Sequence, residues 1–440
     1  MAQIKWAPEG CERQMKQSST RLQTGFNNSL LIILLAAMLL PAAIGCSSPP
    51  TARHNIVLIL VDTLRADHLG CYGYKRLITP NIDKLAKDST LFEQAFSHSP
   101  WTMPSVASIM TSLPPRDHGI TNWKQPLAER HLTLAEQLKK DGYATAAVVS
   151  HFIFEPKYNF NQGFDFFDYS VLEKGHPKKI HSSGEVSDLA VKQLDELGES
   201  GKPFFLWLHY FDPHNDYLKH EGYDYGDEQV DLYDSEIAFT DHHVGRVLQK
   251  LDDLGLRDKT IVVFMADHGE EFRDHGGLRH SRTLYNEVLR IPLLIRAPGF
   301  SPQRIKTTVK ESDLAPTLLT LIGQPIPKAF TGDPFTIKGN KIEVDASRTV
   351  FAETFRMARK KGVVHQNWKL IHDLKKKRYQ LFNLETDPIE KVNLFKSNQQ
   401  MAGKLKSLLA DHYKVKRAKV EEKPLDSDLE EKLRSLGYIN

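Results

Sequence analysis

A hydroxyl side chain stands at the start of a predicted helix within residues 99–110. Thr102 comes two residues before Pro104, and an apolar run follows at helical spacing. Proline fits the first turn of a helix, where free backbone N–H groups and the helix dipole favour an anion. A hydroxyl in this place could attack a phosphate or sulfate ester. Most threonines in this context only cap the helix, so both interpretations stay open on this segment alone.

Acidic and imidazole side chains follow three apolar runs of the chain. They are Asp62 after residues 56–61, Asp212 and His214 after 204–208, and Asp267 and His268 after 260–265. Because the carboxyl ends of parallel strands meet at one edge of a sheet, we expect these side chains to gather near Thr102. Two carboxylates, a neutral imidazole and a hydroxyl suit a divalent cation. Such a cation would lower the pKa of the hydroxyl and neutralise an ester oxygen.

The elements that must position these residues alternate along residues 54–324. Strands are predicted at 56–61, 91–96, 144–149, 204–208, 260–265 and 291–295, and helices at 79–86, 132–141, 184–197, 230–254 and 312–322. This alternation predicts an α/β fold with a doubly wound, mostly parallel sheet. Residues 151–180 are predicted as a long insertion of the kind that carries substrate contacts. Asp241, His242 and His243 are predicted on a solvated helix face.

The pattern changes in the predicted second domain, residues 325–440. Short strands are predicted at 349–353, 368–371 and 379–383, followed by a polar helical tail. They predict a smaller antiparallel α+β subdomain closed by a C-terminal helix. The basic residues 375–378 fit a solvated hairpin turn, and contact with an anionic substrate or lipid headgroup is the alternative.

Residues 1–46 are a predicted processing segment. Lys16 and Arg21 precede the apolar run 30–40, and Ala43-Ile44-Gly45-Cys46 follows. The segment resembles a bacterial lipoprotein signal, which implies a lipidated Cys46, a linker over 47–53 and a place in the cell envelope, on the periplasmic side of the outer membrane. An uncleaved membrane anchor is the alternative.

Composition narrows the class of protein. The chain has 440 residues and a formal net charge of +3, which does not indicate a nucleic-acid binder or a disordered chain. Of its three cysteines, Cys11 and Cys46 fall in the processing segment. Only Cys71 remains, so the mature domain is expected to contain no disulfide.

Eight segments, in order along residues 54–440, resemble the sulfatase-like branch of the alkaline phosphatase superfamily. They are VDTLRADHLGCYGY with TPNIDKLA, SPWTMPSVASIMTSLPPRDHGI, FLWLHYFDPH, ADHGEEFRDHGG, LYNEVLRIPLLIRAPG, FNLETDPIEKVNL and the final LRSLGYI. The resemblance implies an alkaline-phosphatase-like fold and a metal-dependent enzyme that hydrolyses ester bonds.

The same resemblance assigns roles to individual residues. It implies Asp62, Thr102, Asp267 and His268 as metal ligands, Thr102 as nucleophile, and His214 and His280 as residues that bind the ester or act as general acid. His275 is a weaker candidate for substrate binding. Arg65 is expected to orient Asp62, with an ordinary ion pair as the alternative. A second cation held by Asp212, His214 and His280 is a further option.

Three departures from the family's pattern bear on the chemistry. Sulfatases carry Cys or Ser, converted to formylglycine, where Thr102 stands, and Arg where Val106 stands. Thr63 replaces a second Asp found in many sulfatases. Threonine cannot become formylglycine, so none is expected, and the cation could be Mn²⁺, Zn²⁺, Ca²⁺ or Mg²⁺. Threonine nucleophiles in the superfamily occur in phosphodiesterases and in phosphoethanolamine or phosphoglycerol transferases.

We therefore expect an esterase or transferase that prefers a phosphodiester to a sulfate monoester. Its substrate would carry a glycan or lipid headgroup, and Cys46 would attach it to the membrane. One alternative is an arylsulfatase-like hydrolase of sulfuric esters that works without formylglycine. The other is a non-catalytic binder of anionic glycans or lipids, against which the joint presence of Asp62, Thr102, Asp267 and His268 speaks.

Overall fold

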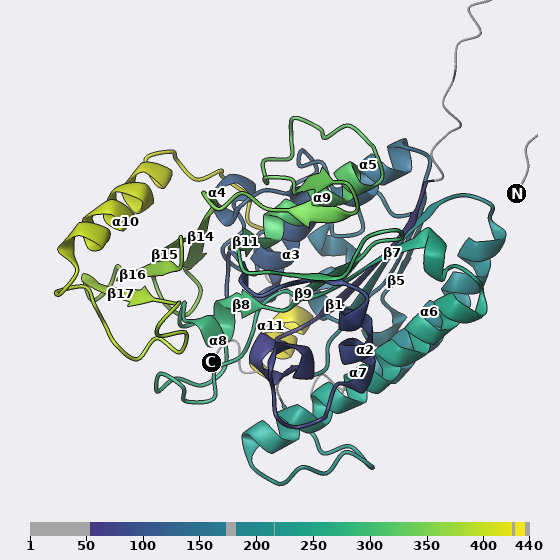
Figure 1. Ribbon diagram of the computed structural model, residues 1–440, viewed down its shortest axis with the longest axis horizontal. Helices are drawn as coiled ribbons and strands as arrows, with labels where there is room; N and C mark the ends of the chain where they lie inside the picture. Colours follow the sequence, from purple (N-terminus) through teal and green to yellow (C-terminus); the bar gives the residue numbers. More distant parts are fainter. Residues whose placement is uncertain (1–52, 173–181, 215, 425–426, 436–440) are drawn as a thin grey trace, which may run out of the picture. The chain divides into compact units, whose positions relative to one another are not determined.

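Strand β1 (Asn55–Val61) is buried along its whole length and lies inside an eight-stranded sheet. The computed structural model describes residues 53–172, 182–214, 216–424 and 427–435. β1 pairs in parallel with β6 (Phe204–Tyr210) on one side and β7 (Thr260–Ala266) on the other. A strand without a polar side needs a covering layer on both faces. Helices α2, α6 and α7 cover one face, and α3, α5 and α9 cover the other (Figure 1).

The sheet is mostly parallel, as predicted. Its order is β10-β2-β9-β7-β1-β6-β4-β5. The outer strands are β10 (Gln303–Ile305), β2 (Thr90–Phe92), β9 (Leu293–Arg296), β4 (Ala144–Val148) and β5 (Phe166–Asp168). β9 runs antiparallel to both of its neighbours. The α/β fold class is therefore confirmed, although β5 lies in the stretch predicted as loop.

Two predicted strands are each divided in the structure. The expected strand 91–96 becomes β2 and β3 (Ala95–Phe96), and 291–295 becomes β8 (Arg290–Ile291) and β9. β3 and β8 pair with each other, and β11 (Val309–Lys310) completes a separate three-stranded sheet. A single apolar run can therefore contribute to two sheets, which periodicity alone does not reveal.

Helices occupy the predicted segments with small shifts at their ends. They are α2 (Pro80–Lys87), α3 (Thr102–Thr111), α5 (Leu134–Lys140), α6 (Ser183–Glu199), α7 (Gln229–Asp253) and α9 (Leu314–Leu321), with the short α4 (Pro115–His118) and α8 (Asn286–Leu289). The prediction of a solvated face is wrong for Asp241, which is buried and accepts hydrogen bonds from the Asn81 and Ile82 backbone N–H groups at the start of α2.

Among the helices the structure describes, none combines the length and hydrophobicity that a membrane span requires.

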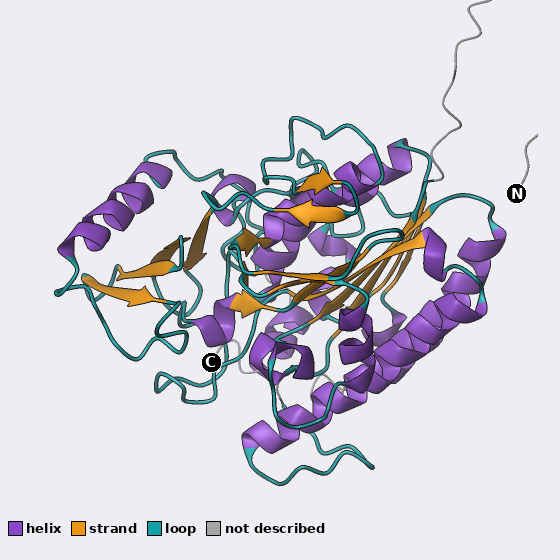
Figure 2. Cartoon of the chain, in the orientation of Figure 1, coloured by secondary structure: helices purple, strands orange, loops and turns teal. Residues whose placement is uncertain are grey.

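The C-terminal part contains a four-stranded antiparallel sheet and helices (Figure 2). The sheet consists of β14 (Thr349–Thr354), β15 (Lys360–His365), β16 (Trp368–Asp373) and β17 (Arg378–Asn383), followed by α10 (Gln399–His412) and α11 (Ser427–Ser435). β15 was not predicted. The basic residues after Asp373 form the β16–β17 turn, because the Lys375 and Lys376 N–H groups donate to Asp373 Oδ1. An antiparallel α+β subdomain is confirmed.

The segment between α9 and β14 forms a hairpin, β12 (Thr336–Lys338) and β13 (Lys341–Glu343). It lies against the first domain, because the Phe335 N–H donates to Thr317 Oγ1 and Gln303 Nε2 donates to the Ile342 carbonyl. The predicted domain boundary at residue 325 stays a prediction. The predicted signal segment with Cys46, and nearly all of the linker, lie outside the described residues.

His98 connects the first domain to the C-terminal sheet. Its Nδ1–H donates to the Phe351 carbonyl at 2.6 Å, and its Nε2 accepts from the Ser312 hydroxyl at 2.9 Å. Ser312, at the start of the predicted helix 312–322, therefore directs its hydroxyl to His98, and Asp313 is the cap residue of α9. Burial lowers the pKa of His98 from the ordinary 6.5 to about 4, so the ring is neutral in the fold at pH 7.

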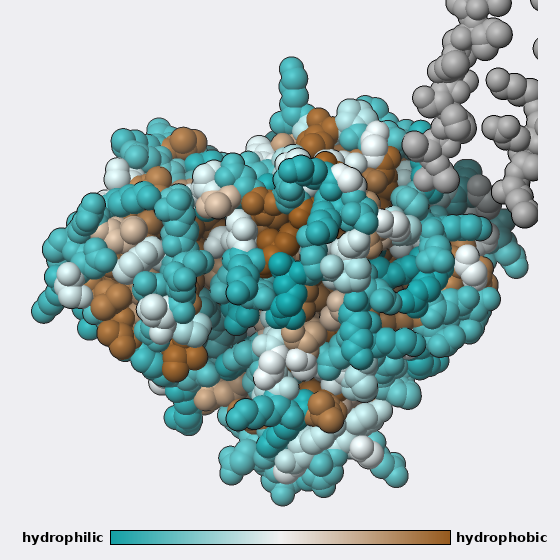
Figure 3. Space-filling view, viewed as in Figure 1, coloured by the Kyte–Doolittle hydropathy of each residue, from teal (hydrophilic) through white to brown (hydrophobic). Residues whose placement is uncertain are grey.

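Apolar side chains on the face shown in Figure 3 are scattered among hydrophilic ones.

Acid is expected to weaken this connection. Because the pKa of His98 is lower in the folded chain than in the unfolded chain, the unfolded chain binds more protons below pH 6.5. The free energy of unfolding should therefore fall as pH falls, and His98 should account for about 1.4 kcal/mol of that fall per pH unit between 6.5 and 4. Urea unfolding at pH 7 and pH 5 in EDTA should show a smaller pH dependence for His98→Gln than for the wild type. Equal pH dependences would contradict this role.

Candidate active site

Four neighbouring strands deliver polar side chains to one edge of the large sheet. In the order β7-β1-β6-β4, their carboxyl ends are adjacent. Asp267 and His268 follow β7, Asp62 follows β1, and Val61 is paired with Ala266 directly before them. His214 follows β6 and His151 follows β4. This arrangement is the usual position of ligand sites in open α/β sheets.

Thr102, the first residue of α3, faces the carboxylates and the imidazole. Its Oγ1 lies 3.3 Å from His268 Nε2 and 3.5 Å from Asp62 Oδ2. His268 Nε2 lies 3.5 Å from Asp62 Oδ1 and 3.5 Å from Asp267 Oδ2. All four side chains are at most 2% exposed. The structure therefore brings together the four residues that the sequence proposed as metal ligands.

The donor atoms of this group fit a divalent cation. Within the described part of the chain, Asp62 Oδ1 and Asp267 Oδ2 have no hydrogen-bond partner although both are buried. Burial raises the pKa of Asp62, and the nearby Asp267 raises it further. His268 Nδ1–H donates to the Gly269 carbonyl at 2.9 Å, so its Nε2 presents a lone pair. Buried carboxylates without a counter-charge are costly, and two carboxylates with an imidazole suit Zn²⁺ or Mn²⁺ better than Ca²⁺.

His214 and His280 lie beside this group. The ring centroids of His280 and His268 are 4.6 Å apart, and those of His280 and His214 are 5.1 Å apart. His280 Nδ1–H donates to Glu270 Oε1 at 3.2 Å, while Tyr217 donates to Glu270 Oε2 at 2.9 Å. The carboxylate therefore fixes the imidazole so that its Nε2 is the nitrogen that can exchange a proton with a substrate.

Asp212 is not brought to the site. Its carboxylate accepts hydrogen bonds from the Ser182 and Ser183 N–H groups at 3.1 Å and 2.8 Å. These bonds hold the start of α6, and they occupy the oxygens that a cation would need. The structure instead places a His214 nitrogen and an Asp62 oxygen near His151. A second cation held by Asp212, His214 and His280 therefore has no support in the geometry.

His275 is placed in a contact between the two domains. Its Nδ1 lies 2.7 Å from Glu287 Oε1, its Nε2–H donates to the Glu390 carbonyl at 3.1 Å, and its ring stacks on Tyr285. Both nitrogens are thus engaged by the protein. The structure gives this residue a structural position, in contrast to the predicted contact with substrate.

Arg65 has the structural role that the sequence favoured, but with other partners. It forms ion pairs with Asp67 and Asp274 and donates to the Glu270 carbonyl. It is 7% exposed, which excludes the alternative of an ordinary surface pair. Arg65 therefore links the loop after β1 to the loop after β7, and these contacts fix the backbone that carries Asp62.

Two histidines of this region were missed by the sequence interpretation. His151 is 1% exposed, and His209, near the end of β6, is fully buried with its Nε2 3.9 Å from Asp62 Oδ2. His151 comes directly after the predicted strand 144–149 and Ser150, so the rule that selected Asp62 and Asp267 could also have selected it. His209 comes directly after the predicted strand 204–208, so the same rule could have selected it too, although in the structure it lies within β6.

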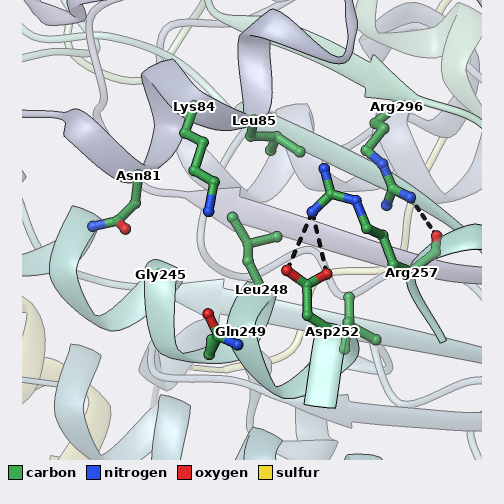
Figure 4. A pocket seen from close by; sticks show the side chains of 10 residues that line it. Asn81, Lys84, Leu85, Gly245, Leu248, Gln249, Asp252, Arg257 and Arg296 are labelled. Atoms are coloured by element: carbon green, nitrogen blue, oxygen red, sulfur yellow. Dashed lines mark hydrogen bonds and ion pairs between the residues drawn. The ribbon is translucent and has the colours of Figure 1, made fainter. Parts of the chain in front are cut away.

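A separate pocket lies between α2 and α7 (Figure 4). It is lined by side chains that include Lys84, Asp252, Arg257 and Arg296. Arg257 pairs with Asp252. None of the residues around Thr102 lines this pocket, so it is not part of the candidate active site.

Metal binding should be visible in thermal stability. A cation that binds only the folded chain stabilises it by about 2.7 kcal/mol at a hundredfold excess over Kd. The Tm of the wild type should therefore rise when Zn²⁺ or Mn²⁺ replaces EDTA. Asp267→Asn should lose this rise, yet it should be no less stable than the wild type in EDTA, because one of two repelling carboxylates is removed.

Asp258→Asn is the matched control, since the Asp258 side chain is 93% exposed and pairs with Arg296, which is not part of the candidate active site. It should retain the full metal-induced rise in Tm. A rise of equal size in Asp267→Asn would show that the cation binds elsewhere.

Comparisons with known proteins agree with this geometry. The sulfatase family model matches residues 54–324, more than half of the chain, and the model of the N-sulphoglucosamine sulphohydrolase C-terminal region matches residues 274–417. An ulvan-active sulfatase of Formosa agariphila is 27% identical over 68% of each chain. An N-acetylglucosamine-6-O-sulfatase of Bacteroides thetaiotaomicron is 23% identical over 87% of this chain and 90% of its own.

Solved structures show the same fold. The structure of BT4656 in complex with its substrate D-glucosamine-2-N,6-O-disulfate has a TM-score of 0.70 and 20% identity, and the match covers 82% of this chain and 98% of that one. Ps i-CgsB in complex with k-i-k-neocarrahexaose also has a TM-score of 0.70, with 21% identity over 88% of this chain and 98% of its own. The fold and the family-model match lead to the same conclusion: the chain belongs to the sulfatase family of ester hydrolases.

Proposed function

We propose that this protein is a metal-dependent hydrolase of phosphoric or sulfuric esters that uses the Thr102 hydroxyl as its nucleophile. The observation that carries the proposal is the position of Thr102 Oγ1, 3.3 Å from His268 Nε2 and 3.5 Å from Asp62 Oδ2. A hydroxyl that only caps a helix would accept a backbone N–H of its own helix, but residue 101 occupies the cap position of α3. Asp62, Asp267, His268 and Thr102 would hold the cation.

The proposed reaction proceeds in two displacements. Thr102 Oγ1 attacks the phosphorus or sulfur atom, and the bond to the leaving alcohol breaks. His280, whose Nδ1–H is held by Glu270, presents a lone pair at Nε2; it takes up the proton of the Thr102 hydroxyl there and passes it to that alcohol, with His214 beside it. Water then displaces Thr102 from the covalent ester, and a proton of that water passes through His280 Nε2 to the released Thr102 oxygen. A bound cation would lower the pKa of the hydroxyl and neutralise the ester oxygens.

Thr102 favours a phosphodiester over a sulfate monoester. A hydrated formylglycine can expel the bound group through its second hydroxyl, whereas a threonine ester has no such route and depends on an external acceptor. We therefore propose phosphodiester hydrolysis as the preferred reaction. Transfer to another alcohol would follow if that alcohol replaces water in the second displacement.

A sulfate ester is the second candidate substrate, because the relatives found are named as sulfatases. The same residues would then attack sulfur and would do so without formylglycine. The non-catalytic alternative would require the protein to bind anionic glycans or lipids and to leave both kinds of ester intact.

A two-substrate assay separates these candidates. With Mn²⁺ or Zn²⁺ bound, the purified protein should hydrolyse a chromogenic phosphodiester with a higher kcat/KM than the matching sulfate monoester. Thr102→Ala should reduce turnover of the diester by at least about a thousandfold, because the nucleophile is lost. Thr102→Ser, which keeps the hydroxyl, should retain measurable turnover.

Each alternative result of this assay would contradict one part of the proposal. Preference for the sulfate ester would replace the phosphodiesterase proposal with the sulfatase one. Full activity of Thr102→Ala would remove Thr102 from the nucleophile's role. Failure of the wild type to turn over either ester with Mn²⁺, Zn²⁺, Ca²⁺ or Mg²⁺ would support the non-catalytic alternative.

We further propose that the protein is attached to the cell envelope by a lipid on Cys46. The apolar run 30–40 and the residues Ala43-Ile44-Gly45 before Cys46 support the proposal. When the full chain is expressed in a bacterium, the wild type should fractionate with membranes. Cys46→Ser should not incorporate labelled fatty acid, whereas Cys71→Ser should still do so. Equal labelling of the wild type and Cys46→Ser would contradict the anchor.

A further inference from the structure

The pocket between α2 and α7 lies toward the edge of the large sheet that is opposite the candidate active site. Arg257 belongs to a short 3-10 helix (Arg257–Lys259) directly before β7, and Arg296 is the last residue of β9. Lys84 reaches the pocket from α2 (Figure 4). Asp267 follows the other end of β7, and the seven residues of that strand separate the two edges by about 23 Å. The pocket is therefore separate from the candidate active site.

Positive charge exceeds negative charge in this pocket. Among its ten lining residues, Lys84, Arg257 and Arg296 are cations and Asp252 is the only acid. Asp252 pairs with Arg257 at 3.2 Å, and Lys84 forms no ion pair within the described part of the chain. The cavity has a volume of about 60 Å³, which gives room for a few water molecules or one small ion. Its charge and its size therefore favour a small anion.

Arg296 differs from the other buried arginines of the described chain. Arg65, Arg296 and Arg348 are 7%, 7% and 8% exposed. Arg65 pairs with two carboxylates at 2.8 Å and 3.0 Å, and Arg348 pairs at 2.7 Å with Asp313, whose side chain is fully buried. The carboxylate nearest to Arg296 is that of Asp258, which lies 3.6 Å away and is 93% exposed, so water screens the pair. Arg296 thus lacks the close counter-charge that the other two have.

The guanidinium of Arg296 also has donors left for a ligand. Its Nη2 donates to the Arg257 carbonyl, whereas its Nε and Nη1 donate to no acceptor among the described residues. Burial lowers the pKa of Arg296, and the charge of Arg257 lowers it further. Guanidinium groups bind oxyanions through pairs of N–H donors. An oxyanion in the pocket therefore supplies both the missing acceptors and the missing negative charge.

We propose that this pocket is a binding site for a small inorganic oxyanion, phosphate or sulfate, held by Arg296, Arg257 and Lys84. The anion connects α2, β9 and the segment before β7. A ligand that binds only the folded chain stabilises it, so the anion stabilises the first domain. The proposal goes beyond the proposed function and does not depend on it, because none of these residues contacts the ester that Thr102 attacks.

Calorimetric titration in EDTA isolates this site, because the carboxylates of Asp62 and Asp267 repel anions when no cation is bound. With ionic strength held constant by chloride, the wild type should bind one equivalent of inorganic phosphate, and sulfate should compete for it. Arg296→Gln should bind phosphate at least about tenfold more weakly, since a charge-assisted contact is lost. In phosphate-free buffer its Tm should be no lower than that of the wild type, because a buried charge without a close partner is removed.

Arg378→Gln is the matched control, since it removes the same charge from an exposed position at the start of β17. It should bind phosphate as tightly as the wild type. Lys84→Met should weaken binding less than Arg296→Gln does, because Lys84 is exposed and contributes a single point charge. Glycerol 3-phosphate carries the same oxyanion on a larger group. It should bind the wild type at least about tenfold more weakly than inorganic phosphate, because the cavity is small.

Three results would overturn the proposal. The wild type could bind no phosphate in EDTA, Arg296→Gln could bind it as tightly as the wild type, or Arg378→Gln could lose as much affinity as Arg296→Gln. The last result would make binding an effect of net charge alone. Equally tight binding of glycerol 3-phosphate would overturn the assignment to a free inorganic anion and would indicate a phosphate group on a larger molecule.

Discussion

The site depends on two buried carboxylates that the fold forces close together. Asp62 and Asp267 are the next residues after Val61 and Ala266, which are partners on adjacent parallel strands. Neighbouring strands lie about 4.8 Å apart, so the register alone sets the separation of the two backbones. Burial and the nearby charge of Asp267 raise the pKa of Asp62. A bound cation would relieve this repulsion and would activate the Thr102 hydroxyl, which lies 3.5 Å from Asp62 Oδ2.

The histidines around these carboxylates differ in what their Nε2 atoms present, because each ring is fixed by the partner of its Nδ1. A carbonyl acceptor for Nδ1–H leaves a lone pair on His268 Nε2, and the Glu270 carboxylate leaves one on His280 Nε2 in the same way. A backbone N–H donor turns His151 Nε2 into a hydrogen-bond donor. Residue type therefore identifies the cluster as a candidate site, while the contact of each Nδ1 decides whether Nε2 presents a lone pair or an N–H.

A buried network holds α3 so that Thr102 meets the strand ends. The Ser105 hydroxyl donates to the Asp267 carbonyl at 2.7 Å and lies 2.7 Å from Glu311 Oε2. Because burial raises the pKa of Glu311 well above its usual range, a protonated Glu311 can donate to Ser105 in turn. Glu311 Oε1 also accepts the His98 N–H, and His98 contacts the C-terminal sheet. The antiparallel subdomain thereby supports α3 and the position of Thr102.

The sequence by itself determined the sheet and four residues of the site. Fully apolar runs require a covered parallel sheet, and such a sheet gathers strand ends, so residue type and position indicated these residues together with Asp212 and His214. The family resemblance then singled out Asp62, Thr102, Asp267 and His268 as metal ligands. Thr102 also predicts that no formylglycine forms, since this modification depends on the chemistry of one side chain. Only the tertiary structure decided that Asp212 holds α6, that His275 joins two domains and that His151 enters the site. Those roles depend on hydrogen-bond partners far apart in the chain or on the direction of one backbone N–H, and neither is encoded in residue type or periodicity.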